Sequence, residues 1–107
     1  MTSKSTFSHS TSKSYALALY ELAKESSELD KVEEGIRALK KLLKDSSDFK
    51  ETIQSPVIKK EEKRDIMFAI SNQSSFSSIL KKFLGFLSTK NRLFFLNQII
   101  DSFLNFV

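Results

Sequence analysis

Apolar residues recur three and four positions apart along most of this chain, which is the spacing of one face of an α-helix. Serine pairs, Pro56 and Asn91 interrupt the pattern. The pattern therefore predicts an all-α fold, a compact six-helix bundle, with residues 1–11 as a disordered Ser/Thr-rich tail. The predicted helices cover approximately residues 12–26, 28–45, 47–54, 59–70, 75–89 and 92–107, and residues 71–74 form a loop.

Local signals refine the ends of these helices. Ser27 with Asp30 resembles a capping box for the second helix, with Asp in place of the usual Glu. Asn91 is suited to a left-handed residue at a helix end. Gly35, inside the second helix, marks either a close contact with another helix or a neutral surface position.

Two of the predicted helices carry two apolar stripes, although one stripe is enough to bury a helix against its own domain. In the first helix one stripe is Ala16, Leu19, Tyr20 and Ala23, and in the fifth it is Phe76, Leu80, Leu84 and Leu87. Either both helices are central and buried on all sides, or their second stripes form a groove for an amphipathic helix of a partner. The groove residues would be Tyr15, Ala18, Leu22, Ile79, Lys82, Phe83 and Phe86.

Composition and charge limit the other functional classes. Two glycines and one proline suit helices, and a net charge of +4 with only three arginines is a mild basic excess. Nucleic-acid binding by a small basic helical protein is the alternative hypothesis. Attachment to a membrane surface is a third, but the phenylalanines spread over several helical faces and favour a packed core. No apolar run spans a membrane, and no signal peptide opens the chain.

Residues for chemistry are scarce. The chain has no cysteine, and His9 in the tail is its only histidine, which we interpret as solvated. Glu33–Glu34 and Glu61–Glu62 are neighbours on a helix and point about 100° apart, so they do not converge on a metal. The sequence thus predicts no catalytic, cofactor or metal site, and no enzyme.

Four segments resemble one known family, in order and in register. The segment SYALALYELA (residues 14–23) resembles the opening R-Y-A-x-A-L-x-x-L-A signature of the delta subunit of F-type ATP synthases, whose mitochondrial counterpart is the oligomycin-sensitivity-conferring protein. Residues 29–32 follow as the start of the second helix. Residues 55–63 resemble the family's N-P-x-I-x-x-x-E-K joint, and residues 90–96 resemble N-G-R-L-x-x-L. Ser14, Leu17 and Asn91 depart from the usual Arg, polar residue and Gly.

The resemblance implies a non-catalytic stator part. The family's N-terminal six-helix domain binds the N-terminal helix of an alpha subunit through its first and fifth helices, and it holds the F1 head against rotor torque. The resemblance covers only that domain, here residues 12–107. We therefore expect a truncated chain that lacks the part contacting the stator b subunits.

Partners and location are expected on the same basis. The domain would contact other F1 subunits, no nucleic acid, and the membrane only indirectly. It would lie at the cytoplasmic face of a bacterial inner membrane, or on the matrix side of the mitochondrial inner membrane in a eukaryote.

Overall fold

The computed structural model describes the backbone of residues 3–107 and the side chains of residues 10–107. It contains six α-helices and one short 3-10 helix, with no strand in the described part, so the predicted all-α six-helix fold is confirmed. The elements are α1 (Ser3–Glu25), α2 (Leu29–Asp45), α3 (Ser47–Gln54), α4 (Lys60–Gln73), α5 (Ser78–Thr89), η1 (Leu93–Phe95) and α6 (Leu96–Phe106).

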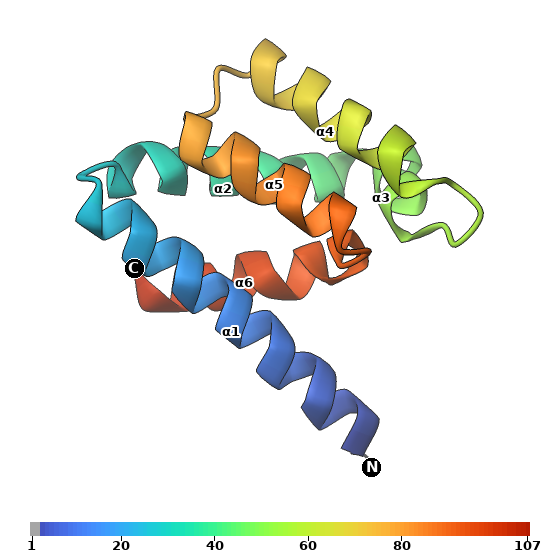
Figure 1. Ribbon diagram of the computed structural model, residues 1–107, viewed down its shortest axis with the longest axis horizontal. Coiled ribbons are helices and arrows are strands. Elements are labelled where there is room, and N and C mark those ends of the chain that lie inside the picture. Colours follow the sequence, from blue (N-terminus) through green and yellow to red (C-terminus); the bar gives the residue numbers. More distant parts are fainter. Residues whose placement is uncertain (1–2) are drawn as a thin grey trace.

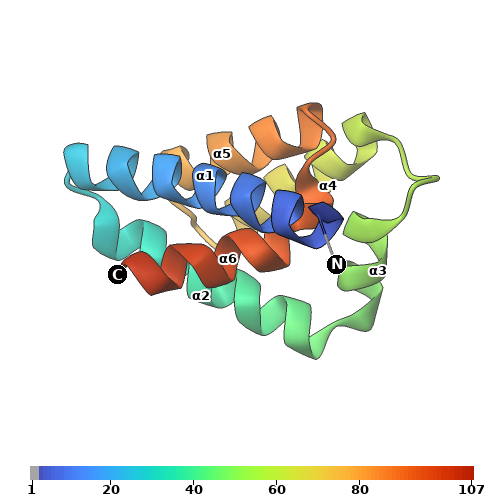
Figure 2. The same ribbon diagram turned by 90° about the horizontal axis from the view of Figure 1, so that it is seen from below.

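The helices pack around one apolar core. Helix α1 lies along α6, α4 lies along α5, and α2 packs against α6 on the other side of the bundle (Figures 1 and 2). The core consists of residues that are fully removed from water, among them Ile36 and Leu39 of α2, Leu80 and Leu84 of α5, and Phe103 of α6. Helix α5 lies between α4 and α1 on one face of the molecule (Figure 1), so one side of α5 faces α4 and the other side faces α1.

Three helices end in the same way. Ser27, Ser75 and Asn91 have positive φ angles of 58°, 57° and 57°, the left-handed conformation of a helix C-terminus. In each case the next residue donates its N–H to a carbonyl five positions back, for example Arg92 to Leu87 at 2.8 Å. The prediction for Asn91 is confirmed.

The predicted capping box at Ser27 is wrong. Ser27 closes α1 instead of opening α2, and the residue that precedes α2 is Glu28, whose side chain makes no capping hydrogen bond. Two other serines do cap helices. The Ser46 hydroxyl accepts the N–H of Phe49 at 3.1 Å at the start of α3, and the Ser77 hydroxyl accepts the N–H of Leu80 at the start of α5.

Several other helix boundaries differ from the prediction. Helix α1 begins at Ser3, not near Ser12. Helix α4 continues through the predicted loop to Gln73, since Ser71 is buried and donates its hydroxyl to the Met67 carbonyl at 2.7 Å. Phe76 precedes α5, which starts at the Ser77 cap, and the first turn of the predicted last helix is the 3-10 helix η1.

Gly35 is a point of close contact between helices. It is buried in α2, and a Cβ atom placed on it would overlap Leu80 of α5 and lie 3.2 Å from the Phe76 ring. The surface alternative is therefore wrong, and the missing side chain lets α2 and α5 approach each other.

Candidate partner-binding face

Helices α1 and α5 lie side by side and run in opposite directions (Figure 1). The Tyr15 ring of α1 meets the Phe86 ring of α5 edge-on, with 6.2 Å between ring centroids and 65° between planes. From this contact, Leu22 lies seven residues along α1 and Ile79 lies seven residues back along α5. The equal spacing brings these two side chains to the same end of the pair.

The two apolar stripes of each helix differ in burial. In the first stripe of α1, Tyr20 is half-buried and the other three residues are buried, with Ala16 and Ala23 at 0% exposure; Leu80 and Leu84 of α5 are equally buried. The second stripes are not covered: Leu22 is 48% and Phe86 46% exposed. The alternative in which both helices are central and buried on all sides is therefore wrong.

We call the second stripes together the α1/α5 face. Ala18, Leu22, Lys82 and Phe86 are exposed on it, whereas the side chains nearer the seam between the helices are half-buried. The half-buried residues Tyr15, Ile79 and Phe83 also pack against the hydrophobic core. The α1/α5 face consists of Tyr15, Ala18, Leu22, Ile79, Lys82, Phe83 and Phe86. The structure brings all seven predicted residues onto these two adjacent helices, and their partner-binding role stays a prediction.

One residue near this face was missed by the sequence reasoning. The Lys90 ammonium lies 5.9 Å from the centroid of the Phe86 ring, an arrangement typical of a cation–π contact. In the sequence, this contact was indicated by the position of Lys90 four residues after Phe86, about one helical turn away. Because Lys82 on α5 is also exposed, the α5 side of the face carries positive charge beside exposed aromatic surface.

The described residues contain no cluster of side chains suited to hold a metal ion. No three carboxylate or imidazole groups among the described side chains converge in a way that could hold a metal ion. The side chain of His9 lies outside the described residues. None of the helices from residue 3 onward is both long enough and apolar enough to cross a membrane.

The distribution of phenylalanines favours a packed core over an interfacial membrane face. Among the phenylalanines whose side chains are described, Phe86 and Phe94 alone are largely exposed. They lie on different elements, α5 and η1, and their exposed rings form no continuous apolar helix face of the kind that lies in a membrane interface.

Comparison with known proteins places the chain in one family. Residues 11–107 match the family model described as ATP synthase delta (OSCP) subunit. The ATP synthase subunit delta of Pelagibacter ubique is 38% identical over 97 residues, covering 91% of this chain and 52% of the relative. The subunit delta of Rhodospirillum rubrum is 39% identical over 90 residues, covering 84% of this chain and 48% of the relative.

A solved structure agrees with these relatives. A chain of the Toxoplasma gondii mitochondrial ATP synthase hexamer superposes with a TM-score of 0.82 at 30% identity, covering 86% of this chain and 51% of that chain. This chain therefore spans about half the length of the relatives that it matches. With six helices in the predicted order and a family match over almost its whole length, the chain belongs to the ATP synthase delta (OSCP) subunit family.

Proposed function

We propose that this chain is a non-catalytic stator component of an F-type ATP synthase and that it binds the N-terminal helix of an alpha subunit across the α1/α5 face. The observation that carries the proposal is the uncovered second stripe on two adjacent helices, centred on the Tyr15–Phe86 contact. By this contact the domain holds the F1 head against the torque of the rotor while proton flow drives ATP synthesis.

The chemistry of the face suits an amphipathic helix. Phe86 and Leu22 offer large, partly exposed apolar groups as anchors, and Ala18 between them on α1 leaves space for a helix to approach closely. Lys82 lies at the exposed edge, where it can pair with an acidic residue of the incoming helix. A static joint needs slow dissociation, and desolvated apolar anchors supply this better than exposed ion pairs.

The remaining assignments follow from the same proposal. Residues 12–107 would act as the family's N-terminal domain, and residues 3–11, which belong to α1, would precede it. The stator b subunits would be contacted by the half of the family's length that this chain does not span. The complex would lie at the cytoplasmic face of a bacterial inner membrane or on the matrix side in a mitochondrion. Family membership favours this role over nucleic-acid binding.

The test is a titration of the protein with a synthetic peptide of the first ~20 residues of the alpha subunit from the same organism, followed by amide NMR shifts. We expect saturable shifts along α1 and α5, centred on Ala18 and Phe86. A peptide with its apolar residues replaced by serine is the control. Shifts that are absent, or that centre on α2 or α3, would contradict the proposal.

Salt separates the proposed role from its alternative. Binding that depends on an apolar face changes little between about 50 and 200 mM salt, whereas a nucleic-acid contact through several lysines weakens by orders of magnitude over that range. A parallel titration with a DNA duplex at both salt concentrations completes the comparison. Tight, strongly salt-dependent duplex binding without peptide binding would support the alternative.

A further inference from the structure

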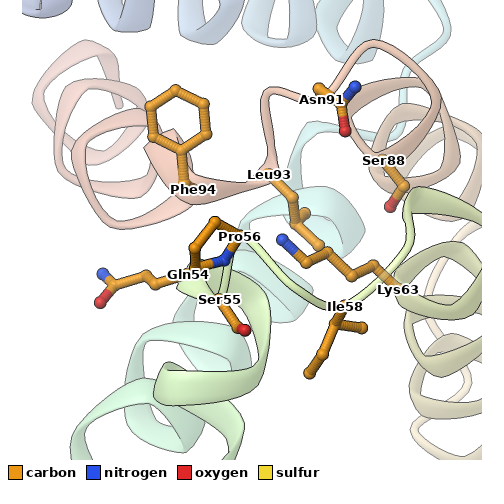
Figure 3. Close-up of a pocket in the computed structure, with 9 residues that line it drawn as sticks. All are labelled: Gln54, Ser55, Pro56, Ile58, Lys63, Ser88, Asn91, Leu93 and Phe94. Carbon is orange, nitrogen blue, oxygen red and sulfur yellow. The ribbon is translucent and has the colours of Figure 1, made fainter.

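A second candidate site, formed by none of the residues of the α1/α5 face, lies where the connection between α3 and α4 meets the turn between α5 and η1. It is a cavity of about 480 Å³, within the range of small-ligand sites (Figure 3). Two of the segments singled out in the sequence, residues 55–63 and 90–96, converge there although they are far apart in the chain. Their residues in the cavity wall are Ser55, Pro56, Ile58, Lys63, Asn91, Leu93 and Phe94.

Lys63 is the one ionisable residue in this wall, since the other lining residues are neutral. Its side chain reaches from α4 toward the middle of the lining residues (Figure 3). The ammonium donates to the Ile53 carbonyl at 3.1 Å, at the end of α3, and so has two further N–H groups for other acceptors. Partial burial lowers the pKa of Lys63, and no ion pair among the described residues includes it.

Apolar surface lies beside this ammonium. Phe94 lines the cavity and is 46% exposed, and its ring is held against Phe95 with 4.3 Å between centroids. Pro56 is an exposed part of the wall, and the neighbouring Val57 is 86% exposed. The site therefore combines one partly desolvated cation with a fixed aromatic ring and aliphatic groups.

We propose that this cavity binds a carboxylate carried on an apolar group, with Lys63 bound to the carboxylate and Phe94 packed against the apolar part. The carboxylate can belong to a free small acid or to an acidic side chain next to an apolar residue in a peptide. A carboxylate restores a charged partner to an ammonium that has lost part of its hydration. The alternative is that Lys63 only closes the end of α3, but that role uses a single N–H and leaves the exposed Phe94 ring unexplained.

The probes are 3-phenylpropanoate, its neutral amide 3-phenylpropanamide, and N-acetyl-Phe-Asp-amide, each titrated into the full 107-residue chain with detection by amide NMR shifts. We expect saturable shifts in residues 55–63 and 91–95 for the acids, and binding of the neutral amide to be weaker by about tenfold. If the dipeptide binds more tightly than the free acid, the source is a peptide; the reverse order indicates a free acid.

Substitutions test the two halves of the site. Lys63→Met should weaken binding of 3-phenylpropanoate about tenfold. The matched control Lys60→Met removes the same charge from an exposed position of α4 and should leave binding unchanged. Because Lys63→Met also removes the contact with α3, Phe94→Ser provides a second test at an exposed position and should weaken binding about fivefold.

Three results would overturn the proposal. Equal binding of the acid and the amide would remove the role of Lys63, and equal losses in Lys63→Met and Lys60→Met would indicate unspecific attraction to lysines. Shifts that do not saturate, or that spread over the whole surface, would show that the cavity is no binding site. None of these results depends on whether the α1/α5 face binds its proposed partner.

Discussion

Replacing Gly35 by alanine tests the close contact between α2 and α5. The new methyl group would overlap Leu80, which is fully buried and cannot move into water, and it would also press on Phe76. Overpacking of this kind costs about 1–3 kcal/mol. Alanine is better than glycine in a helix by about 1 kcal/mol. The overlap with a buried side chain puts the cost at the upper end, so we expect Gly35→Ala to destabilise the protein by about 2 kcal/mol.

The assay is urea unfolding followed by circular dichroism, with thermal unfolding as a second measurement. For a domain of this size, 2 kcal/mol corresponds to a decrease in Tm of about 10 °C. The m-value should stay unchanged, because the substitution alters the folded core and not the extent of unfolding.

A second background separates steric overlap from other causes. Leu80→Val removes the methyl group that the new Cβ would meet, at a cost near 1 kcal/mol for the lost group. In that background we expect Gly35→Ala to be neutral or stabilising, because the helix preference remains and most of the overlap is gone. The same loss of about 2 kcal/mol in both backgrounds would refute the steric reasoning.

Three further predictions concern the binding face and the helix ends. Ala18→Glu and Phe86→Asp should each abolish binding of the alpha-subunit peptide by NMR while the unfolding midpoint changes little, since both positions are exposed; unfolding of either variant would instead assign these residues to the core. Asn91→Gly should raise the free energy of unfolding by about 0.5–1 kcal/mol in urea, because glycine adopts φ 57° without steric cost, and a decrease would contradict the assigned turn. Ser77→Ala should lower stability by about 1 kcal/mol in the same assay, since the hydroxyl accepts the Leu80 N–H at 3.2 Å, and no change would exclude the cap.

The sequence predicted the number and order of the helices because each buries an apolar stripe, and periodicity reports burial directly. It failed where one residue type has several structural roles. Four serines lie near helix ends, but their roles differ. Ser46 caps a helix and Ser71 lies buried inside one, whereas Ser27 and Ser75 end helices with positive φ angles. Which use applies depends on the backbone angle and on tertiary contacts, and a local pattern contains neither.

The two candidate sites also differed in how far the sequence could predict them. The residues of the α1/α5 face were predictable, because both of its halves are second stripes within single helices, and the family resemblance pairs the first and fifth helices. The cavity at Lys63 was not, since it requires residues 55–63 and 91–94 to meet in space. The motifs themselves were visible, but nothing in their spacing indicated that they share a wall.

The two glycines of the chain allow close packing behind α5. Gly35 of α2 lets Leu80 of α5 approach closely, and Gly85 of α5 lies against the Phe68 ring of α4, where an added Cβ would come within 2.7 Å of the ring. These contacts position α5 from two directions and leave the flank beside α1 open. If the α1/α5 face binds a helix as proposed, a helix held in this way would lose less conformational entropy in forming the joint. Under the proposed function, the close packing behind α5 would therefore support the joint together with the exposed residues in front of it.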